Sequence, residues 1–167
     1  MDITNRLAVP ADAPEMAEVH MHSWEVAYKG IIPDNFIRAK NDTRPELYKR
    51  AITNENTNTY IIQYAEKTVG IMRVAPPLDD DLTDSYYEQH FLYLHSDYFR
   101  QGIGTHAVEF AFEIARNLEK TAMVVWVLEE NVNSIRFYEK CGFITDGKAS
   151  ERDFGKILKS KRMRRDL

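Results

Sequence analysis

The sequence predicts an α/β fold in which helices cover a mixed β-sheet. Short alternating or apolar segments of strand length are interleaved with amphipathic segments of helical period. The segment TAMVVWVL, residues 121–128, is almost continuously apolar, which is typical of a buried parallel strand. The chain has 167 residues, 44% of them hydrophobic, and no repeat or linker, so residues 1–167 are expected to form a single domain.

The first half of the chain predicts one strand, two helices and a hairpin. ITNRLAV alternates as a strand does, and Pro10 and Asp12 then introduce a helix that runs to about Gly30. IIPDNFI is expected to be a connection, and a shorter helix spans roughly residues 45–53. TYIIQYAE and TVGIMRVA are two strands joined by a tight turn around Lys67.

The second half predicts strands that alternate with helices. After the acidic loop PPLDDDLTD comes the strand YEQHFLYL, residues 87–94, and then a long helix with one apolar stripe. TAMVVWVL is the buried strand, and SIRFYEKC is a short helix that Gly142 ends. GFITDG and KILKSKRM are the last two strands. This order of elements favours a mixed sheet.

Composition narrows the class of function. The 22 Lys and Arg against 26 Asp and Glu give a net charge of −4, which lacks the positive field of nucleic-acid binders. Cys141 is the single cysteine, so it excludes an internal disulfide and makes a cysteine-based zinc site unlikely to form. His20 and His22 lie two residues apart on a helix and point in different directions, so we expect no metal site. Without a signal-like or membrane-length apolar run, we expect a cytoplasmic protein.

Gly102 and Gly104 stand directly before the long helix and allow two interpretations. GIGTHA matches the dinucleotide pattern G-x-G-x-x-G/A, but that pattern requires a tight turn directly after a strand, and HSDYFRQ separates Leu94 from Gly102. Alternatively, free backbone N–H groups at the helix start, with Arg100 beside them, suit a pyrophosphate group. The glycines alone fit a plain strand-to-helix turn equally well.

Two segments carry a resemblance to a known family. LYLHSDYFRQGIGTHAVEFAFEIA, residues 92–115, resembles the acetyl-CoA motif of the GCN5-related N-acetyltransferase (GNAT) superfamily. WVLEENVNSIRFYEKCGF, residues 126–143, resembles the segment that follows it, and SWEVAYKGIIPDNFI resembles the N-terminal helical region of one bacterial branch. The resemblance implies a mixed, mostly antiparallel sheet of six to seven strands with a parallel pair split at the acyl-CoA site, flanked by about four helices. It also implies an N-acetyltransferase, monomeric or homodimeric, that moves an acetyl group from acetyl-CoA to a primary amine of a small molecule in a ternary complex.

The resemblance also implies a coenzyme site. Backbone around Leu92 to Leu94 would hold the pantetheine arm and donate an N–H to the thioester oxygen, and Asn131 would hydrogen-bond that arm. The implied residues are Leu92, Tyr93, Leu94, Arg100, Gln101, Gly102, Ile103, Gly104, Thr105, Asn131 and Ser134. Phe99 stands where the family usually has Gln or Arg, which moves the expected contacts to Arg100 and the backbone of residues 100–105.

Direct acyl transfer needs a neutral amine, although a primary alkyl ammonium titrates near ~10.4. Glu88 falls where the family often has a carboxylate, so it is the leading general base, with His90 as the reserve. Strand alternation would place Glu88, His90, Leu92 and Leu94 on one face. Tyr138 matches the tyrosine with which family members often protonate the departing coenzyme A thiolate. On reference pKa values, a hydrogen bond from its hydroxyl to the thiolate is easier to achieve than full proton transfer.

The acceptor stays open at this point. Trp24, Tyr28, Phe36 and His90 are expected to line its pocket, although the aromatic stripe also suits a core. PPLDDDLTD would attract a cationic amine or form a solvated loop. The acceptor is a polyamine, amino acid, antibiotic or peptide, and two other functions remain open: modification of protein N-termini or lysines, and acyl-CoA binding without catalysis.

Overall fold

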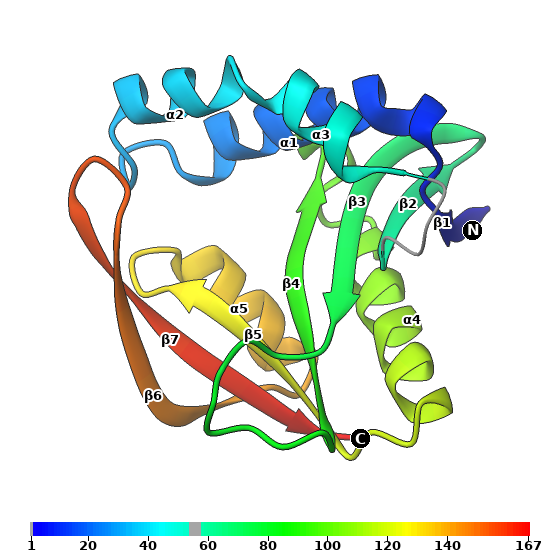
Figure 1. The fold of residues 1–167 in the computed structure, drawn as a ribbon, viewed down its shortest axis with the longest axis vertical. Coiled ribbons are helices and arrows are strands. Elements are labelled where there is room, and N and C mark those ends of the chain that lie inside the picture. The colour runs from blue at the N-terminus through cyan, green and yellow to red at the C-terminus, as the bar shows by residue number, and fades with distance from the viewer. Residues whose placement is uncertain (1, 54–57) are drawn as a thin grey trace.

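The computed structural model describes residues 2–53 and 58–167, which form a seven-stranded sheet in the order β1-β2-β3-β4-β5-β7-β6 (Figure 1). Neighbouring strands of this sheet are antiparallel except β4 and β5, which are parallel. This topology confirms the predicted mixed sheet with its parallel pair. The strands are β1 Ile3–Leu7, β2 Thr59–Tyr64, β3 Lys67–Ala75, β4 Tyr86–Leu94, β5 Ala122–Leu128, β6 Ile144–Asp153 and β7 Ile157–Asp166.

Five α-helices flank the sheet in the described part of the chain, one more than the order of elements predicted. They are α1 Ala13–Ala27, α2 Asp34–Asn41, α3 Arg44–Ala51, α4 Ile103–Asn117 and α5 Val132–Lys140. The additional helix is α2, which was expected to be a connection. It buries only Ile37 and Asn41, so it shows too little apolar period to be recognised. None of the described helices has the length and apolar character needed to cross a membrane.

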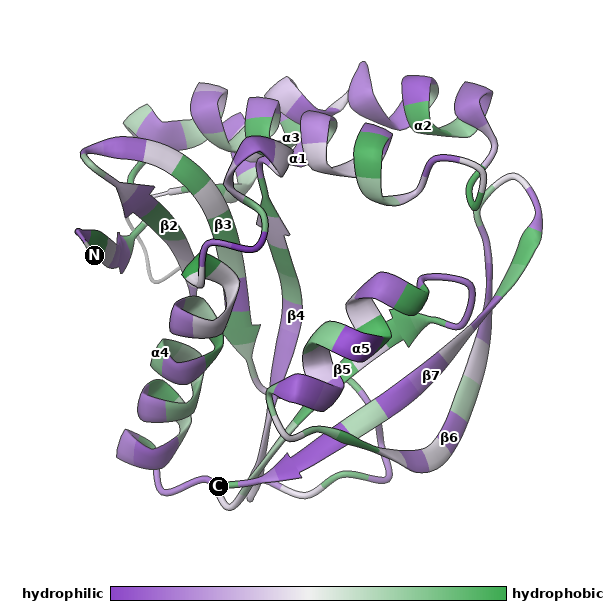
Figure 2. Cartoon of the chain, turned by 180° about the vertical axis from the view of Figure 1, so that it is seen from behind, coloured by the Kyte–Doolittle hydropathy of each residue, from purple (hydrophilic) through white to green (hydrophobic). Residues whose placement is uncertain are grey.

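The helices cover both faces of the sheet. Ile62 and Met72 pack in a core with α4 and α5, whereas their neighbours Ile61 and Ile71 pack in a second core with α1 and α3. Adjacent strand residues point to opposite faces, so the two cores lie on the two sides of the sheet. Figure 2 shows α4 with its hydrophilic residues outward and its hydrophobic residues toward the sheet.

Two local predictions need correction. Asp12 stands at the N-cap of α1, but its carboxylate accepts hydrogen bonds from Arg6 at 2.7 Å and from the Val9 N–H at 2.8 Å instead of from the helix. The turn of the β2–β3 hairpin consists of Ala65 and Glu66, both with positive φ, and therefore precedes Lys67.

Strands β4 and β5 separate soon after they begin to pair. Their parallel register joins Tyr86–Glu88 to Ala122–Val124 and does not continue beyond Glu88 in the described residues. The backbone of β4 beyond Glu88 therefore has a neighbour only in β3, and its other edge is open toward β5.

A β-bulge in β4 changes which residues share a face. Gln89 pairs with Val74 and Phe91 with Arg73, so His90 is an extra residue in the strand. Leu92 and Leu94 consequently pack with the α4 and α5 core, which also contains Tyr87, while Phe91 and Tyr93 pack with the α1 core. The expectation that Glu88 shares a face with Leu92 and Leu94 is therefore wrong, because alternation fails at the bulge.

Candidate active site

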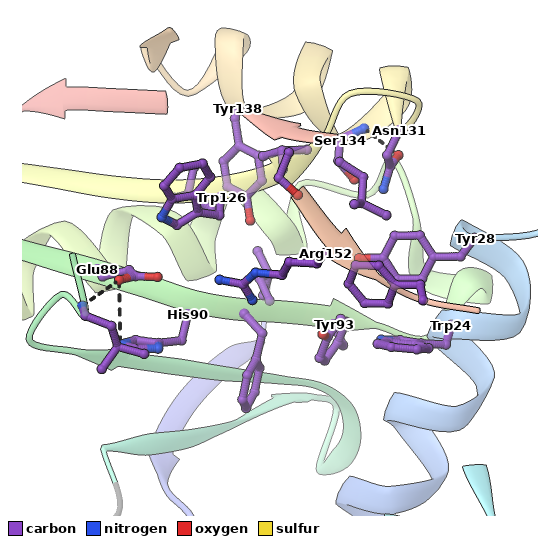
Figure 3. A pocket seen from close by; sticks show the side chains of 18 residues that line it. Trp24, Tyr28, Glu88, His90, Tyr93, Trp126, Asn131, Ser134, Tyr138 and Arg152 are labelled. Carbon is purple, nitrogen blue, oxygen red and sulfur yellow. Dashed lines mark hydrogen bonds and ion pairs between the residues drawn. The ribbon is translucent and has the colours of Figure 1, made fainter. Parts of the chain in front are cut away.

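A cavity of about 260 Å³ lies where β4 and β5 separate (Figure 3). Segments far apart in the sequence build it: α1, the acidic loop after β3, the strands β4 and β5, the start of α5, and the β6–β7 hairpin. It brings together both predicted catalytic residues and most of the predicted acceptor and pantetheine contacts. The predicted residues that line it are Trp24, Tyr28, Glu88, His90, Leu92, Tyr93, Asn131, Ser134 and Tyr138.

Glu88 lines this cavity and is buried. Its carboxylate accepts a hydrogen bond from the Leu78 N–H at 3.3 Å and lies 4.0 Å from His90 Nε2. Burial raises the pKa of Glu88, and the neighbouring His90, the Leu78 N–H and the charge of Arg152 offset part of this rise. A carboxyl group with a raised pKa is a better match to an amine proton near neutral pH, which suits a general base.

His90 is held by the acidic loop. Its Nε2 donates to the Pro76 carbonyl at 3.1 Å. This contact fixes the imidazole ring beside Glu88.

The acidic loop is bound to the sheet and is not a freely solvated loop. The buried Arg162 side chain donates to Asp79 at 3.0 Å, to Asp81 at 2.9 Å and to Asp146 at 2.6 Å. Trp126 also donates its indole N–H to Asp79 at 2.9 Å. Asp79 and Asp81, two of the three consecutive aspartates, are thus ion-paired to Arg162, which holds the loop against the sheet as a wall of the cavity.

Tyr138 projects from α5 into the cavity, and Gln89 positions it (Figure 3). The Gln89 Nε2 donates to the Tyr138 hydroxyl at 2.6 Å, which leaves the hydroxyl hydrogen free to donate elsewhere. Burial raises the pKa of Tyr138 above its ordinary value, so full proton transfer to a thiolate is less favourable than a hydrogen bond. Sequence reasoning missed Gln89, whose only signal is a polar side chain in the middle of a strand.

Asn131 connects the end of β5 to α5. It is buried, and its side-chain oxygen accepts the Ser134 N–H at 3.2 Å as the N-cap of α5. The cap fixes the side chain, and the amide nitrogen makes no hydrogen bond within the described residues. That nitrogen is therefore available to donate into the cavity.

The glycine loop leads directly into the start of α4. Gly102 is the N-cap of α4 with φ of 81°, a left-handed conformation that favours glycine. His106 makes the first helical hydrogen bond to the Gly102 carbonyl at 3.0 Å, so the N–H groups of residues 103–105 have no partner within the helix. Gln101 donates to the Asp97 carbonyl at 2.9 Å, while Arg100 and Phe99 are exposed.

Gly104 has a packing role that the sequence did not reveal. A Cβ atom at this position would lie 3.1 Å from Phe137 and 3.3 Å from Leu94. Gly104 therefore allows α4 to approach α5 and β4 closely, whether or not a phosphate binds nearby.

One side of the cavity is lined by aromatic residues. They are Trp24 of α1, Tyr28 directly after this helix, and Phe154, whose ring lies 6.3 Å from that of Trp24. Phe36 of α2 does not line the cavity but packs behind Phe154 with ring centroids 6.0 Å apart. A Cβ at Gly155 would be 3.2 Å from Phe36, so the tip of the β6–β7 hairpin lies against α2 (Figure 1).

The histidines of α1 have different environments. His20 is buried against Tyr93, with ring centroids 4.1 Å apart, and burial lowers its pKa to about 2. His22 stacks on His95 at 3.7 Å, and the two histidines form with Asp97 a cluster whose ligand atoms lie within 4.8 Å of one another. Sequence reasoning compared His20 only with His22 and missed this cluster, which the turn after β4 brings to α1 outside the cavity.

Cys141 lies apart from the cavity lining. It is buried at the end of α5, and burial raises the pKa of its thiol. A thiol with a raised pKa forms little thiolate, so Cys141 is a packed residue in this fold.

Comparisons with known proteins identify a family, a related sequence and solved structures that are similar to this chain. The family model "Acetyltransferase (GNAT) family" matches residues 18–143. The uncharacterised N-acetyltransferase YuaI of Bacillus subtilis is 26% identical over 137 residues, which cover 82% of this chain and 78% of YuaI. The PaiA N-acetyltransferase of Thermoplasma acidophilum, solved in complex with coenzyme A, superposes with a TM-score of 0.75 at 19% identity and 100% coverage of both chains. YncA of Salmonella typhimurium, solved with acetyl-CoA, gives a TM-score of 0.71 at 20% identity, covering 100% of this chain and 95% of YncA.

The family model spans most of α1, both strands at the opening, the glycine loop and α5, whereas the β6–β7 hairpin, which also lines the cavity, lies beyond its end. The two solved structures have the same fold. The chain therefore belongs to the GNAT family and is an N-acetyltransferase.

Proposed function

We propose that the chain, working as one domain, transfers the acetyl group of acetyl-CoA to a primary amine of a small molecule by direct attack in a ternary complex. The observation that carries this proposal is that Glu88 and Tyr138 line the same cavity from different elements. Glu88 accepts the amine proton, directly or through water, and Tyr138 donates a hydrogen bond to the departing thiolate.

The donor site is proposed to follow the open edge of β4. Backbone groups of residues 92–94 on this edge are free to pair with the pantetheine arm, and Asn131 faces them from the other side of the opening. The pyrophosphate would lie at the start of α4, where unpaired N–H groups and the helix dipole favour an anion. The PaiA and YncA structures, which contain coenzyme A and acetyl-CoA, support this assignment.

Direct transfer is favoured over an acyl-enzyme route. The cysteine is buried outside the cavity, and burial raises its pKa. Ser134 and Ser160, the two serines of the lining, lack a neighbouring histidine base among the described contacts. An activated nucleophile needs such a base within hydrogen-bonding distance.

A small acceptor is favoured by the shape of the site. The cavity holds about 260 Å³, and the β6–β7 hairpin closes against α2 beside it through Phe36 and Phe154. Drug-sized ligand pockets typically measure about 300–1,000 Å³, so a peptide segment would not fit without moving the hairpin.

Acetyl-CoA binding by calorimetry and thiol release with a panel of amines test the proposal. The expected result is binding, together with turnover on small primary amines that falls about 10- to 100-fold in Tyr138→Phe, the range for a hydrogen bond to a charged group. The control Tyr64→Phe removes a hydroxyl from β2, outside the cavity, and leaves the rate unchanged. Binding without turnover on any amine would identify an acyl-CoA-binding module, and turnover restricted to peptides would identify a protein-modifying enzyme.

A further inference from the structure

The cavity contains one permanently charged cation that the proposed chemistry does not use. Arg152 of β6 lines it, and Figure 3 shows its guanidinium group pointing inward toward Glu88. Within the described residues, this guanidinium makes no hydrogen bond or ion pair. It is also too exposed to be a core arginine. A free guanidinium directed into a ligand cavity provides a forked set of donors for an oxyanion.

The other arginines near the site are already engaged. Arg162 binds three aspartates, and Arg44 lies behind the aromatic wall with its guanidinium 4.1 Å from the Trp24 ring centroid. Asp79 and Asp81 of the acidic loop are ion-paired to Arg162, and neither of them lines the cavity. The charges that remain inside the cavity are therefore the carboxylate of Glu88 and the guanidinium of Arg152.

We infer that the acceptor is an amino acid, with its amine beside Glu88 and its carboxylate on Arg152. This inference rests on the proposed function and names its substrate class. A zwitterion matches one anion and one cation that face each other across a small cavity, whereas the second ammonium of a polyamine would be repelled by Arg152. The aromatic wall of Trp24, Tyr28 and Phe154 beside Arg152 then receives an apolar side chain.

The same placement couples acceptor binding to the base. Burial raises the pKa of Glu88, and the charge of Arg152 offsets part of this rise in the free site. A carboxylate bound on Arg152 cancels much of this effect, so Glu88 becomes a stronger base when the acceptor is present. An acceptor without a carboxylate would leave Glu88 weaker.

The test compares amino acids with their own carboxyl amides and decarboxylated amines. Each is assayed by thiol release at saturating acetyl-CoA, with the wild type, Arg152→Met and Lys156→Met. Methionine keeps an unbranched apolar stem in place of Arg152. Lys156 lies in the same hairpin and pairs with Glu130 at 3.8 Å outside the cavity. Lys156→Met is therefore the matched control, because it also removes one positive charge from this hairpin. Ratios between variants remove the difference in amine pKa between the acceptors.

For at least one apolar amino acid, Arg152→Met is expected to lower kcat/KM by about 10- to 100-fold, the range for charge-assisted hydrogen bonds. The amide and the decarboxylated amine should change by less than about twofold, and Lys156→Met should leave all three unchanged. With the decarboxylated amine, the acidic limb of the pH profile should move to higher pH in Arg152→Met, because the charge that lowers the Glu88 pKa is gone.

Equal loss on all three acceptors in Arg152→Met would overturn the inference, as would a wild-type preference for carboxylate-free amines. In both cases turnover persists, so the proposed acetyltransferase function would stand. The absence of thiol release with every amine would instead overturn both.

Discussion

Gln89 is expected to act on the reaction only through Tyr138. It is 1% exposed, donates to the Tyr138 hydroxyl at 2.6 Å, and has a side-chain oxygen that is buried without a hydrogen-bond partner. Gln89→Met keeps the length of the side chain and removes both polar atoms. The lost hydrogen bond costs about 0.5–1.5 kcal/mol, but removal of the unpaired oxygen returns about 1–3 kcal/mol. The free energy of unfolding should therefore stay constant or rise.

Catalysis should respond in the opposite direction. Without the Gln89 donor, the Tyr138 hydroxyl is no longer held toward the cavity, and kcat should fall about 3- to 10-fold, the equivalent of one neutral hydrogen bond. A double-mutant cycle with Tyr138→Phe isolates this effect. The double variant should be as slow as Tyr138→Phe alone, and Gln63→Met in β2, away from the cavity, is the control. An unchanged kcat in Gln89→Met, or an equal loss in the Tyr138→Phe background, would refute the reasoning.

The remaining predictions concern the proposed base Glu88, the packing of Gly104, and the ion pairs that Arg162 makes with three aspartates. Glu88→Gln should lower kcat/KM about 10²-fold near neutral pH. This difference should narrow as the pH falls through the raised pKa of Glu88, where the wild-type base is also protonated; a constant ratio across the pH range would remove Glu88 from this role. Gly104→Ala should lower the free energy of unfolding by about 1–3 kcal/mol in chemical denaturation, because its Cβ would lie 3.1 Å from Phe137. Unchanged stability would show that the helices relax. Arg162→Met should cost about 3 kcal/mol or more by the same assay, whereas Arg164→Met, at an exposed pair, should cost less than about 1 kcal/mol; equal losses would contradict the importance of burial.

The succession of strands and helices along the chain was predictable because its signals are local, whereas the split parallel pair was implied by the family resemblance. The apolar run of residues 121–128 and the apolar stripe of α4 report burial directly, and β5 lies within a residue of the predicted strand. Helix α2 was not predicted because it buries little apolar surface. The C-terminal half of β6, which carries Arg152, was not predicted because its residues are almost all exposed and do not alternate between buried and exposed positions.

Site residues that the family resemblance identifies were predictable, whereas residues that reach the site only through tertiary packing were not. Glu88, Asn131 and Tyr138 lie in the cavity as the motif implied. Gln89 and Arg152 reach the site through contacts between elements distant in sequence, and no spacing rule reports such contacts.

In the proposed reaction, the alternation of β4 just before the bulge at His90 lets one strand contribute to both steps. Gln89 points to the α5 side and holds Tyr138, while its neighbour Glu88 points to the opposite face and receives the Leu78 N–H. Both lie where the pairing of β4 with β5 stops. Adjacent residues on a strand necessarily face opposite sides, so the group that orients the thiolate donor and the proposed base for the amine come from one short segment. After the bulge, the side chains of Leu92 and Leu94 turn to the α4 side, which leaves the backbone edge of β4 as the surface that we propose for both donor and acceptor.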